Sequence, residues 1–263
     1  LPPIFAVTVA YIGDEWPAKE ATTAAGIYSS GSSLGGFSGR LVTGVIADLI
    51  SWRAGFAVLA GVAAVGAVAV AFLLPRERRF VRSEGLLASS RQMLGHFRNS
   101  QLVATFAVGF AVLFNFICTF TFISFHLAAP PYNLSASWLG TIFVTYLVGS
   151  VLTPWIGWAV GRFGRRQFMV GVIAIWLAGI ALTLAPSLLL IVAGLALGAG
   201  CGLICQAVST GFVTVTAKAG RSSAVGLYVT SFYLGGSFGA AVGAIAWTLG
   251  GWPACVALVA AML

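Results

Sequence analysis

Charged side chains are scarce in this sequence. Only 8% of the 263 residues are Asp, Glu, Lys or Arg, and 59% are hydrophobic, whereas an ordinary soluble domain carries about 25% charged residues. This composition excludes a soluble domain with a charged surface. The apolar residues gather into blocks such as 54–74 and 168–185, each near the roughly 20 residues that a helix needs to cross a bilayer. The sequence therefore predicts an all-α polytopic membrane protein.

Acidic residues are the rarest charged class, and none lies in the middle of an apolar block. A carboxylate at that depth is the usual proton carrier of a membrane protein, so this sequence offers no such group. The six acids occupy block ends or connections: Asp14, Glu15, Glu20, Asp48, Glu77 and Glu84.

Histidine and cysteine are too few and too scattered for a catalytic or metal centre. Histidine occurs only at positions 96 and 126. Cys201 and Cys205 are four residues apart, which matches neither a redox CxxC pair nor a zinc pair. We interpret all four cysteines as small buried hydrophobes. Since an enzyme needs converging acids, bases or metal ligands, we expect no enzymatic activity, no cofactor and no metal.

Basic residues fix the expected orientation in the membrane. Twelve Lys and Arg residues fall in one set of connections between the apolar blocks, and only Arg53 falls in the opposite set. By the positive-inside rule, the basic connections face the cytoplasm. The net charge of +8 then reflects topology and contact with anionic lipid rather than nucleic-acid binding. The predicted spans are 1–13, 22–48, 54–74, 101–127, 137–160, 168–185, 188–213, 223–249 and 252–263.

The longest polar stretch, residues 76–100, is predicted to be a cytoplasmic linker between two groups of spans. Apolar residues such as Leu87 and Leu94 lie among its arginines, which favours a short helix on the membrane surface. An irregular, solvated loop is the alternative.

One sequence pattern occurs twice in the chain. Residues 26–39 read GIYSSGSSLGGFSG and residues 226–239 read GLYVTSFYLGGSFG, an offset of 200 without a gap. Two copies with the same orientation indicate a parallel repeat, as in transporters built from two six-helix halves. If the second half begins near Gln101, the first begins about 100 residues ahead of Leu1, which leaves room for three more spans. We therefore expect this chain to be part of a longer protein.

Two short motifs resemble those of the major facilitator superfamily. GWAVGRFGRR at 157–166 is similar to its cytoplasmic loop motif G-x-x-x-D-R-x-G-R-R, with Gly161 in place of Asp. GSSLGG at 31–36 resembles the G-P-x-x-G-G motif of its proton-driven efflux antiporters, with Ser32 in place of Pro. The resemblance implies a two-bundle transporter with residues 1–75 ending the first bundle and residues 101–263 forming the second. The loop-motif residues are Gly157, Arg162, Gly164, Arg165 and Arg166.

Glycines recur at intervals of about four residues in both copies of the repeat. Such spacing places them on one helix face, where neighbouring backbones can approach closely. Close packing is one interpretation; the other is that these faces also seal or hinge the two bundles. The expected helix-packing residues are Gly31, Gly35, Gly36, Gly39, Gly235, Gly236, Gly239 and Gly243.

Isolated polar residues inside the spans mark an expected substrate pathway, because polar groups in hydrocarbon are costly unless paired or wetted. Arg40 is the single Lys or Arg within a predicted span. It either extends outward toward Asp48 or faces the cavity between the bundles and binds an anionic group. The other expected pathway residues are Asn115, Tyr146, Gln206 and Tyr228.

The function that the resemblance implies is secondary active export of a small organic compound by alternating access, coupled to protons. Either that coupling uses an acid in three further spans ahead of residue 1, or the protein is not proton-coupled. A facilitator or importer of sugars or organic anions is the alternative within transport, and a membrane scaffold is the alternative outside it. We expect a monomer in the bacterial inner membrane, in contact with lipid, substrate and protons, and no nucleic-acid partner.

Overall fold

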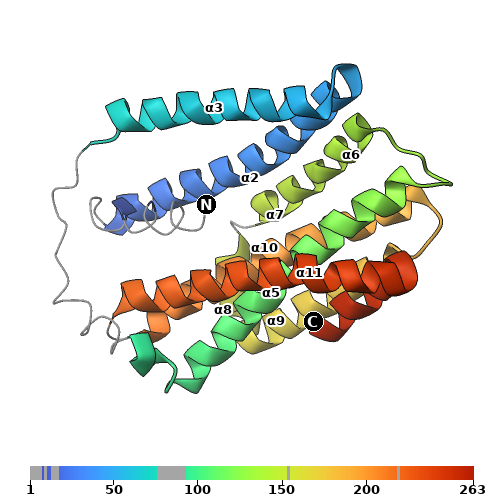
Figure 1. Ribbon diagram of the computed structural model, residues 1–263. Helices are drawn as coiled ribbons and strands as arrows, with labels where there is room; N and C mark the ends of the chain where they lie inside the picture. Colours follow the sequence, from blue (N-terminus) through green and yellow to red (C-terminus); the bar gives the residue numbers. More distant parts are fainter. Residues whose placement is uncertain (1–7, 9–10, 13–17, 76–92, 153–154, 218–219) are drawn as a thin grey trace. The chain divides into compact units, whose positions relative to one another are not determined.

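The computed structural model describes residues 8, 11–12, 18–75, 93–152, 155–217 and 220–263 (Figure 1). Every regular element within these ranges is helical. This confirms the all-α prediction. Most of the predicted linker, residues 76–92, lies outside the described residues. In its described part, residues 93–96 form one helical turn.

The long helices follow the predicted spans within a few residues. Their ends coincide with changes from apolar blocks to polar or glycine-rich connections, which is why composition alone located them. The six long helices are α2 (Ala18–Leu49), α3 (Trp52–Leu73), α5 (Ser100–Ala128), α9 (Arg165–Leu182), α10 (Leu188–Thr216) and α11 (Arg221–Met262).

The predicted span 137–160 is not one continuous helix. It consists of α6 (Ala136–Ile142), the 3-10 turn η1 (Phe143–Thr145), α7 (Tyr146–Leu152) and α8 (Ile156–Phe163). Residues 153–154, between α7 and α8, lie outside the described residues. Hydropathy could not reveal these interruptions, because the residues on both sides of each break are equally apolar.

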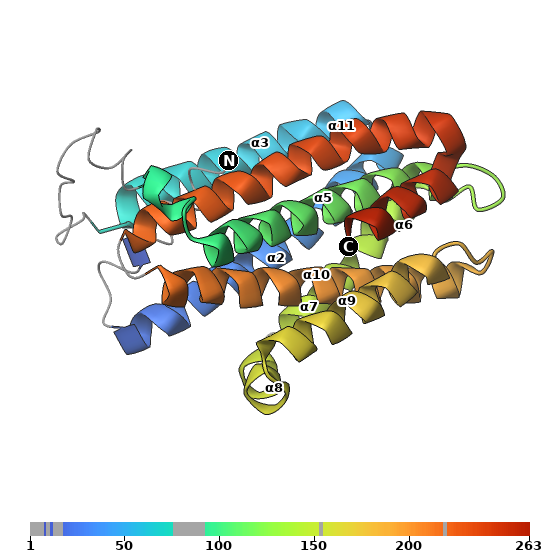
Figure 2. The same cartoon turned by 90° about the horizontal axis from the view of Figure 1, so that it is seen from below.

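Helix α11 joins the last two predicted spans across a sharp turn. Gly250 and Gly251 have non-helical dihedral angles, and the φ of Gly251 is +59°, a region that favours glycine. The chain reverses direction at this point in Figure 2. The gap predicted between residues 249 and 252 is therefore present in the structure.

Five of the described helices are long and apolar enough to cross a membrane: α3, α5, α9, α10 and most of α11. Ala136–Gly149 is a shorter apolar segment. These lengths fit the expected multi-pass membrane protein.

The chain divides into two compact units. One contains residues 1–8, 82–126 and 148–263, and the other contains residues 9–81 and 127–147. The first unit holds α5, α8, α9, α10 and α11, and the second holds α2, α3 and α6. The bundle limits expected at residues 75 and 101 stay a prediction.

In the first unit, α5, α9, α10 and α11 pack around shared apolar clusters. Trp176 of α9 is 2% exposed and belongs to a cluster with Val112, Cys201 and Cys205. At the end of the linker, Nε2 of His96 lies 3.0 Å from Oγ of Ser223. This contact ties the short turn before α5 to the start of α11.

In the second unit, α2 and α3 form a helical hairpin (Figure 1). Ser51 caps the start of α3, where its hydroxyl accepts the N–H of Ala54 at 3.2 Å. The first helix of the interrupted span, α6, packs along α2. This pairing places the aromatic residues of η1 and α7 near the middle of α2.

Candidate functional site

Arg40 projects from α2 into an aromatic environment. Its Cζ atom lies 4.5 Å from the ring centroid of Phe143 and 5.5 Å from that of Tyr146. Its Nη1 donates a hydrogen bond to the Gly36 carbonyl at 3.1 Å, one turn toward the start of α2. Both distances fall within the range of cation–π attraction. The side chain is exposed and turns toward Gly36 rather than Asp48, and its role in the substrate pathway stays a prediction.

Asp48 accepts hydrogen bonds from the start of α6. Its carboxylate accepts the backbone N–H groups of Ala136 at 3.0 Å and Ser137 at 2.7 Å. These are orphan donors in the first turn of α6, where a negative charge also faces the positive end of the helix dipole. Asp48 thus fixes the start of α6 against the end of α2.

Two glycines allow α2 and α6 to approach closely. A Cβ atom added to Gly44 would lie 2.5 Å from the Ala136 carbonyl oxygen, and one added to Gly140 would lie 2.9 Å from the Arg40 carbonyl oxygen. Neither glycine belongs to the motifs that the sequence analysis selected. A small-residue spacing of four, from Ala136 to Gly140, could have found the second of them. Gly44 lies eight residues after Gly36, with Arg40 midway between them.

Asn115 on α5 is the clearest buried polar residue of the first unit. Its side chain is 0% exposed, and neither Nδ2 nor Oδ1 has a hydrogen-bond partner among the described residues. Thr119, one turn further, has a buried hydroxyl without a partner among the same residues. By contrast, Thr141 and Thr210 donate to carbonyls of their own helices. An amide cannot satisfy itself in that way, so Asn115 remains a candidate pathway residue.

The other expected pathway residues lie on three elements. Tyr146 is 7% exposed and packs against Phe143 edge to face, with ring centroids 5.2 Å apart. Gln206 is partly buried on α10. Tyr228 on α11 is 2% exposed and lies against Gly109, where an added Cβ would sit 2.5 Å from its ring. The structure therefore brings Arg40 and Tyr146 together, while Asn115, Gln206 and Tyr228 belong to the first unit.

The repeated glycines have unequal surroundings. On α11, an added Cβ at Gly235 or Gly239 would collide with the backbone of α5 at Phe110 or Phe114. Gly236 and Gly243 lie equally close to α5 side chains. On α2, a Cβ at Gly31 or Gly35 would meet no described atom within 4 Å, and Gly36 and Gly39 make ordinary contacts.

The loop motif forms the junction of α8 and α9. Gly164 has a φ of +76° and separates the two helices, which a residue with a side chain would adopt only with strain. Gly157 and Arg162 lie within α8, and Arg165 and Arg166 open α9. No three His, Cys, Asp or Glu side chains form a potential metal site among the residues that the structure describes.

Comparison with known proteins decides the family. The sequence pattern of the Major Facilitator Superfamily matches residues 2–135 and 112–263, which together cover nearly the whole chain. The chain belongs to the major facilitator superfamily. The fold and the helix count of its described part agree with this assignment.

Several bacterial relatives cover most of the chain. It is 32% identical over 264 residues, 99% of its length, to the inner membrane transport protein YnfM of Escherichia coli (strain K12). It is 28% identical over 258 residues, 98% of its length, to the uncharacterized MFS-type transporter YybF of Bacillus subtilis (strain 168). The matches cover only 63% and 64% of these relatives. The chain thus spans less than two thirds of the length of either relative.

Proposed function

We propose that the complete protein is a secondary active transporter that exports a small organic compound by alternating access, coupled to protons. Membership of the major facilitator superfamily and the names of its relatives support transport across a membrane. The efflux direction rests on the resemblance of residues 31–36 to the antiporter motif. The proposed substrate class rests on one observation, the aromatic surroundings of the Arg40 guanidinium.

Arg40 has more capacity for hydrogen bonding than its surroundings use. A guanidinium carries five N–H donors, and among the described residues Arg40 makes one hydrogen bond, to Gly36. Its guanidinium lies over the rings of Phe143 and Tyr146. A charge at a helix centre costs about 2.5 to 3.5 kcal/mol, and cation–π contacts offset about 0.5 to 2 kcal/mol of such a cost.

An anionic group on the substrate would offset the remainder. Carboxylates and phosphates accept hydrogen bonds from the edge of a guanidinium in a bidentate geometry. The aromatic rings beside Arg40 would then contact the apolar part of the same molecule. The substrate class that this setting favours is a small organic anion with an apolar body.

Proton coupling needs a carboxylate that this chain does not supply within its spans. All six acids lie at span ends or in connections. Because the relatives are longer than this chain, we assign the proton carrier to a part of the complete protein outside residues 1–263. A midspan Asp or Glu in that part of the complete protein is the corresponding expectation.

The test measures transport into everted membrane vesicles that contain the complete protein. A panel of fluorescent organic acids and organic cations is offered with and without an imposed pH gradient. We expect gradient-dependent uptake of at least one acid, most of which is lost in Arg40→Ala and partly kept in Arg40→Lys. Arg53→Ala is the matched control, because Arg53 also lies over an aromatic ring, that of Trp52, but at the very start of α3.

The outcomes separate the alternatives. Uptake of the acid by Arg40→Ala at the wild-type rate would show that Arg40 does not bind the substrate. Equilibration of the acid without a gradient would identify a facilitator, and absence of transport for the whole panel would favour a scaffold.

A further inference from the structure

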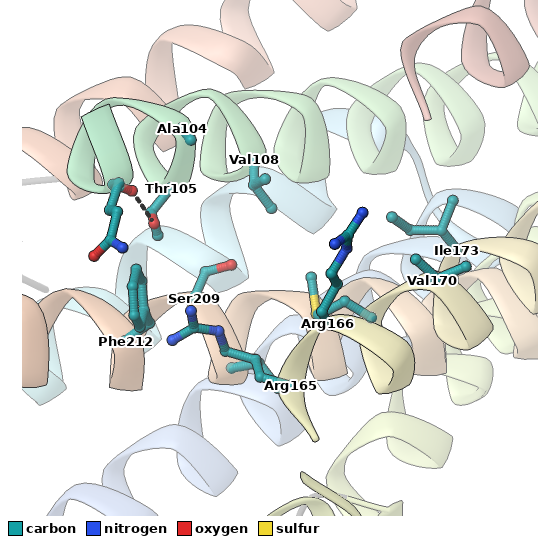
Figure 3. Close-up of a pocket in the computed structure, with 12 residues that line it drawn as sticks. Ala104, Thr105, Val108, Arg165, Arg166, Val170, Ile173, Ser209 and Phe212 are labelled. Carbon is teal, nitrogen blue, oxygen red and sulfur yellow. Dashed lines mark hydrogen bonds between the residues drawn. The ribbon is translucent and has the colours of Figure 1, made fainter. Parts of the chain in front are cut away.

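The first unit contains a pocket of about 430 Å³ between α5, α9 and α10 (Figure 3). This volume falls within the roughly 300 to 1,000 Å³ of small-molecule pockets. Figure 3 shows the guanidinium of Arg165 turned toward Phe212 and that of Arg166 extended toward the α5 side. Gln101 and Thr105 of α5 and Ser209 of α10 complete the polar part of the lining. None of the roles assigned above uses this pocket.

The lining changes from basic to apolar along the membrane normal. Arg165 and Arg166 stand at the start of α9, in a connection that the positive-inside rule places at the cytoplasm. Val170 and Ile173 follow on the same helix, and Ile173 lies about 12 Å deeper than Arg165 at 1.5 Å per residue. The pocket therefore has a charged end at the membrane surface and an apolar end within the bilayer.

The helices that line this pocket carry no carboxylate to balance its positive charge. No Asp or Glu occurs in the sequence after Glu84, so α5, α9 and α10 carry none. Arginine stays protonated in proteins, and the positive end of a helix dipole does not stabilise a cation at the start of α9. Both arginines are exposed, so an external anion can reach them and offset the two guanidinium charges.

Arg165 is also held in place for binding. Its Cζ atom lies 3.4 Å from the ring centroid of Phe212. Stacking covers one face of the guanidinium. The N–H donors lie in the plane of the group and stay free to donate to a phosphate. A preorganised side chain loses less conformational entropy when the ligand arrives.

From these observations we infer that the pocket binds an anionic phospholipid of the cytoplasmic leaflet. The phosphodiester accepts hydrogen bonds from Arg165 and Arg166, and the first part of one acyl chain lies along Met169, Val170 and Ile173. A free phosphate would use the arginines but not the apolar wall, whereas a lipid uses both. Basic pockets between spans on the cytoplasmic side have the chemistry that lipid headgroups need.

The experiment measures lipid retention by native mass spectrometry of the purified protein in detergent. Phosphatidylglycerol and phosphatidylcholine with identical acyl chains are added at equal concentration. We expect several-fold greater retention of phosphatidylglycerol by the wild type. The double variant Arg165→Gln/Arg166→Gln should lose this preference, with retention of phosphatidylglycerol falling by roughly tenfold or more.

Two further variants separate the pocket from general charge attraction. Arg162→Gln removes one positive charge from the same loop without touching the lining, and it should keep the wild-type preference. Val170→Trp keeps every charge and fills the apolar end. Since Val170 is 62% exposed, this substitution should fold normally, as checked by circular dichroism, and should lower phosphatidylglycerol retention.

Three results would overturn the inference. Equal losses in Arg162→Gln and in the double variant would show nonspecific attraction. Displacement of the lipid by inorganic phosphate at about 10 mM, too dilute to screen charges at contact distance, would show a free-anion site. Unchanged retention in Val170→Trp would show that no acyl chain enters the pocket. Because the readout is binding, these results stand apart from those of the transport assay.

Discussion

Helices α2 and α11 carry almost the same glycine-rich sequence, but the two copies have different neighbours. Gly235 and Gly239 of α11 lie so close to the α5 backbone that a Cβ atom would overlap Phe110 or Phe114. Their counterparts Gly35 and Gly39 on α2 have open space or an ordinary contact among the described residues. A glycine motif therefore permits close approach of two helices, and the partner helix determines whether the approach occurs.

Helix α2 makes its own close approach at another position. Gly44 lies against the backbone of α6 at Ala136 and Ser137, eight residues beyond Gly36, and the residue at the matching offset on α11 is Ala244. If the repeat extends to α5, its offset of 200 residues puts the counterpart of α5 outside residues 1–263. We expect that helix, in the complete protein, to cover the glycine face of α2.

The largest expected effect is that of Gly235→Leu. A leucine there must push α5 away from α11, and overpacking of this kind costs about 1 to 3 kcal/mol or more. Gly35→Leu is the matched control and should change the free energy of unfolding by no more than about 0.5 kcal/mol. Thermal unfolding of the purified 263-residue chain, followed by circular dichroism, measures both. Equal destabilisation by the two variants would contradict the comparison.

Replacement of glycine by alanine should change sign between positions. Gly44→Ala places a methyl group 2.5 Å from a carbonyl oxygen, so we expect it to destabilise the chain by about 1 to 3 kcal/mol. Gly31→Ala meets no described atom within 4 Å, and removal of a glycine from a helix interior stabilises by about 0.5 to 1 kcal/mol. The same unfolding assay checks both signs, and a loss of stability in Gly31→Ala would show that its face is packed.

The buried amide of Asn115 offers a test in the first unit. A buried polar group without a partner costs about 1 to 3 kcal/mol, so Asn115→Leu should raise stability while transport by the complete protein falls. Thr105→Val is the control, because its hydroxyl already donates to the Gln101 carbonyl at 2.7 Å, and it should show no gain in stability. A destabilised Asn115→Leu would indicate a structural role for the amide instead.

The smallest effect is expected at Asp48. Asp48→Ala removes the acceptor of two N–H groups in the first turn of α6 and should loosen α6 locally rather than unfold the chain. Amide hydrogen exchange at Ala136 and Ser137 should become faster in this variant, and Asp48→Asn should keep part of the protection because its amide oxygen can still accept. Unchanged exchange in Asp48→Ala would show that the carboxylate does not hold α6.

The long helices and the turn at Gly250 and Gly251 were predictable from sequence, because an apolar block of sufficient length satisfies its backbone in a bilayer only as a helix. The candidate site was predictable in part. Arg40 was identifiable as an arginine inside a span, and Asn115 as an amide in an apolar block. Phe143 was missed, because an aromatic residue in an apolar block carries no signal of its neighbours.

What the sequence by itself determined is the class of the protein, its helices, its repeat and its expected orientation, since each of these depends on composition and spacing along one segment. The tertiary structure decided which glycines are packed, that Arg40 turns to Gly36 and the rings of η1 and α7 rather than to Asp48, and that two arginines meet an apolar wall beside Phe212. These features depend on which helices become neighbours. That choice is made by the summed packing of whole faces, and no local pattern in one helix contains it.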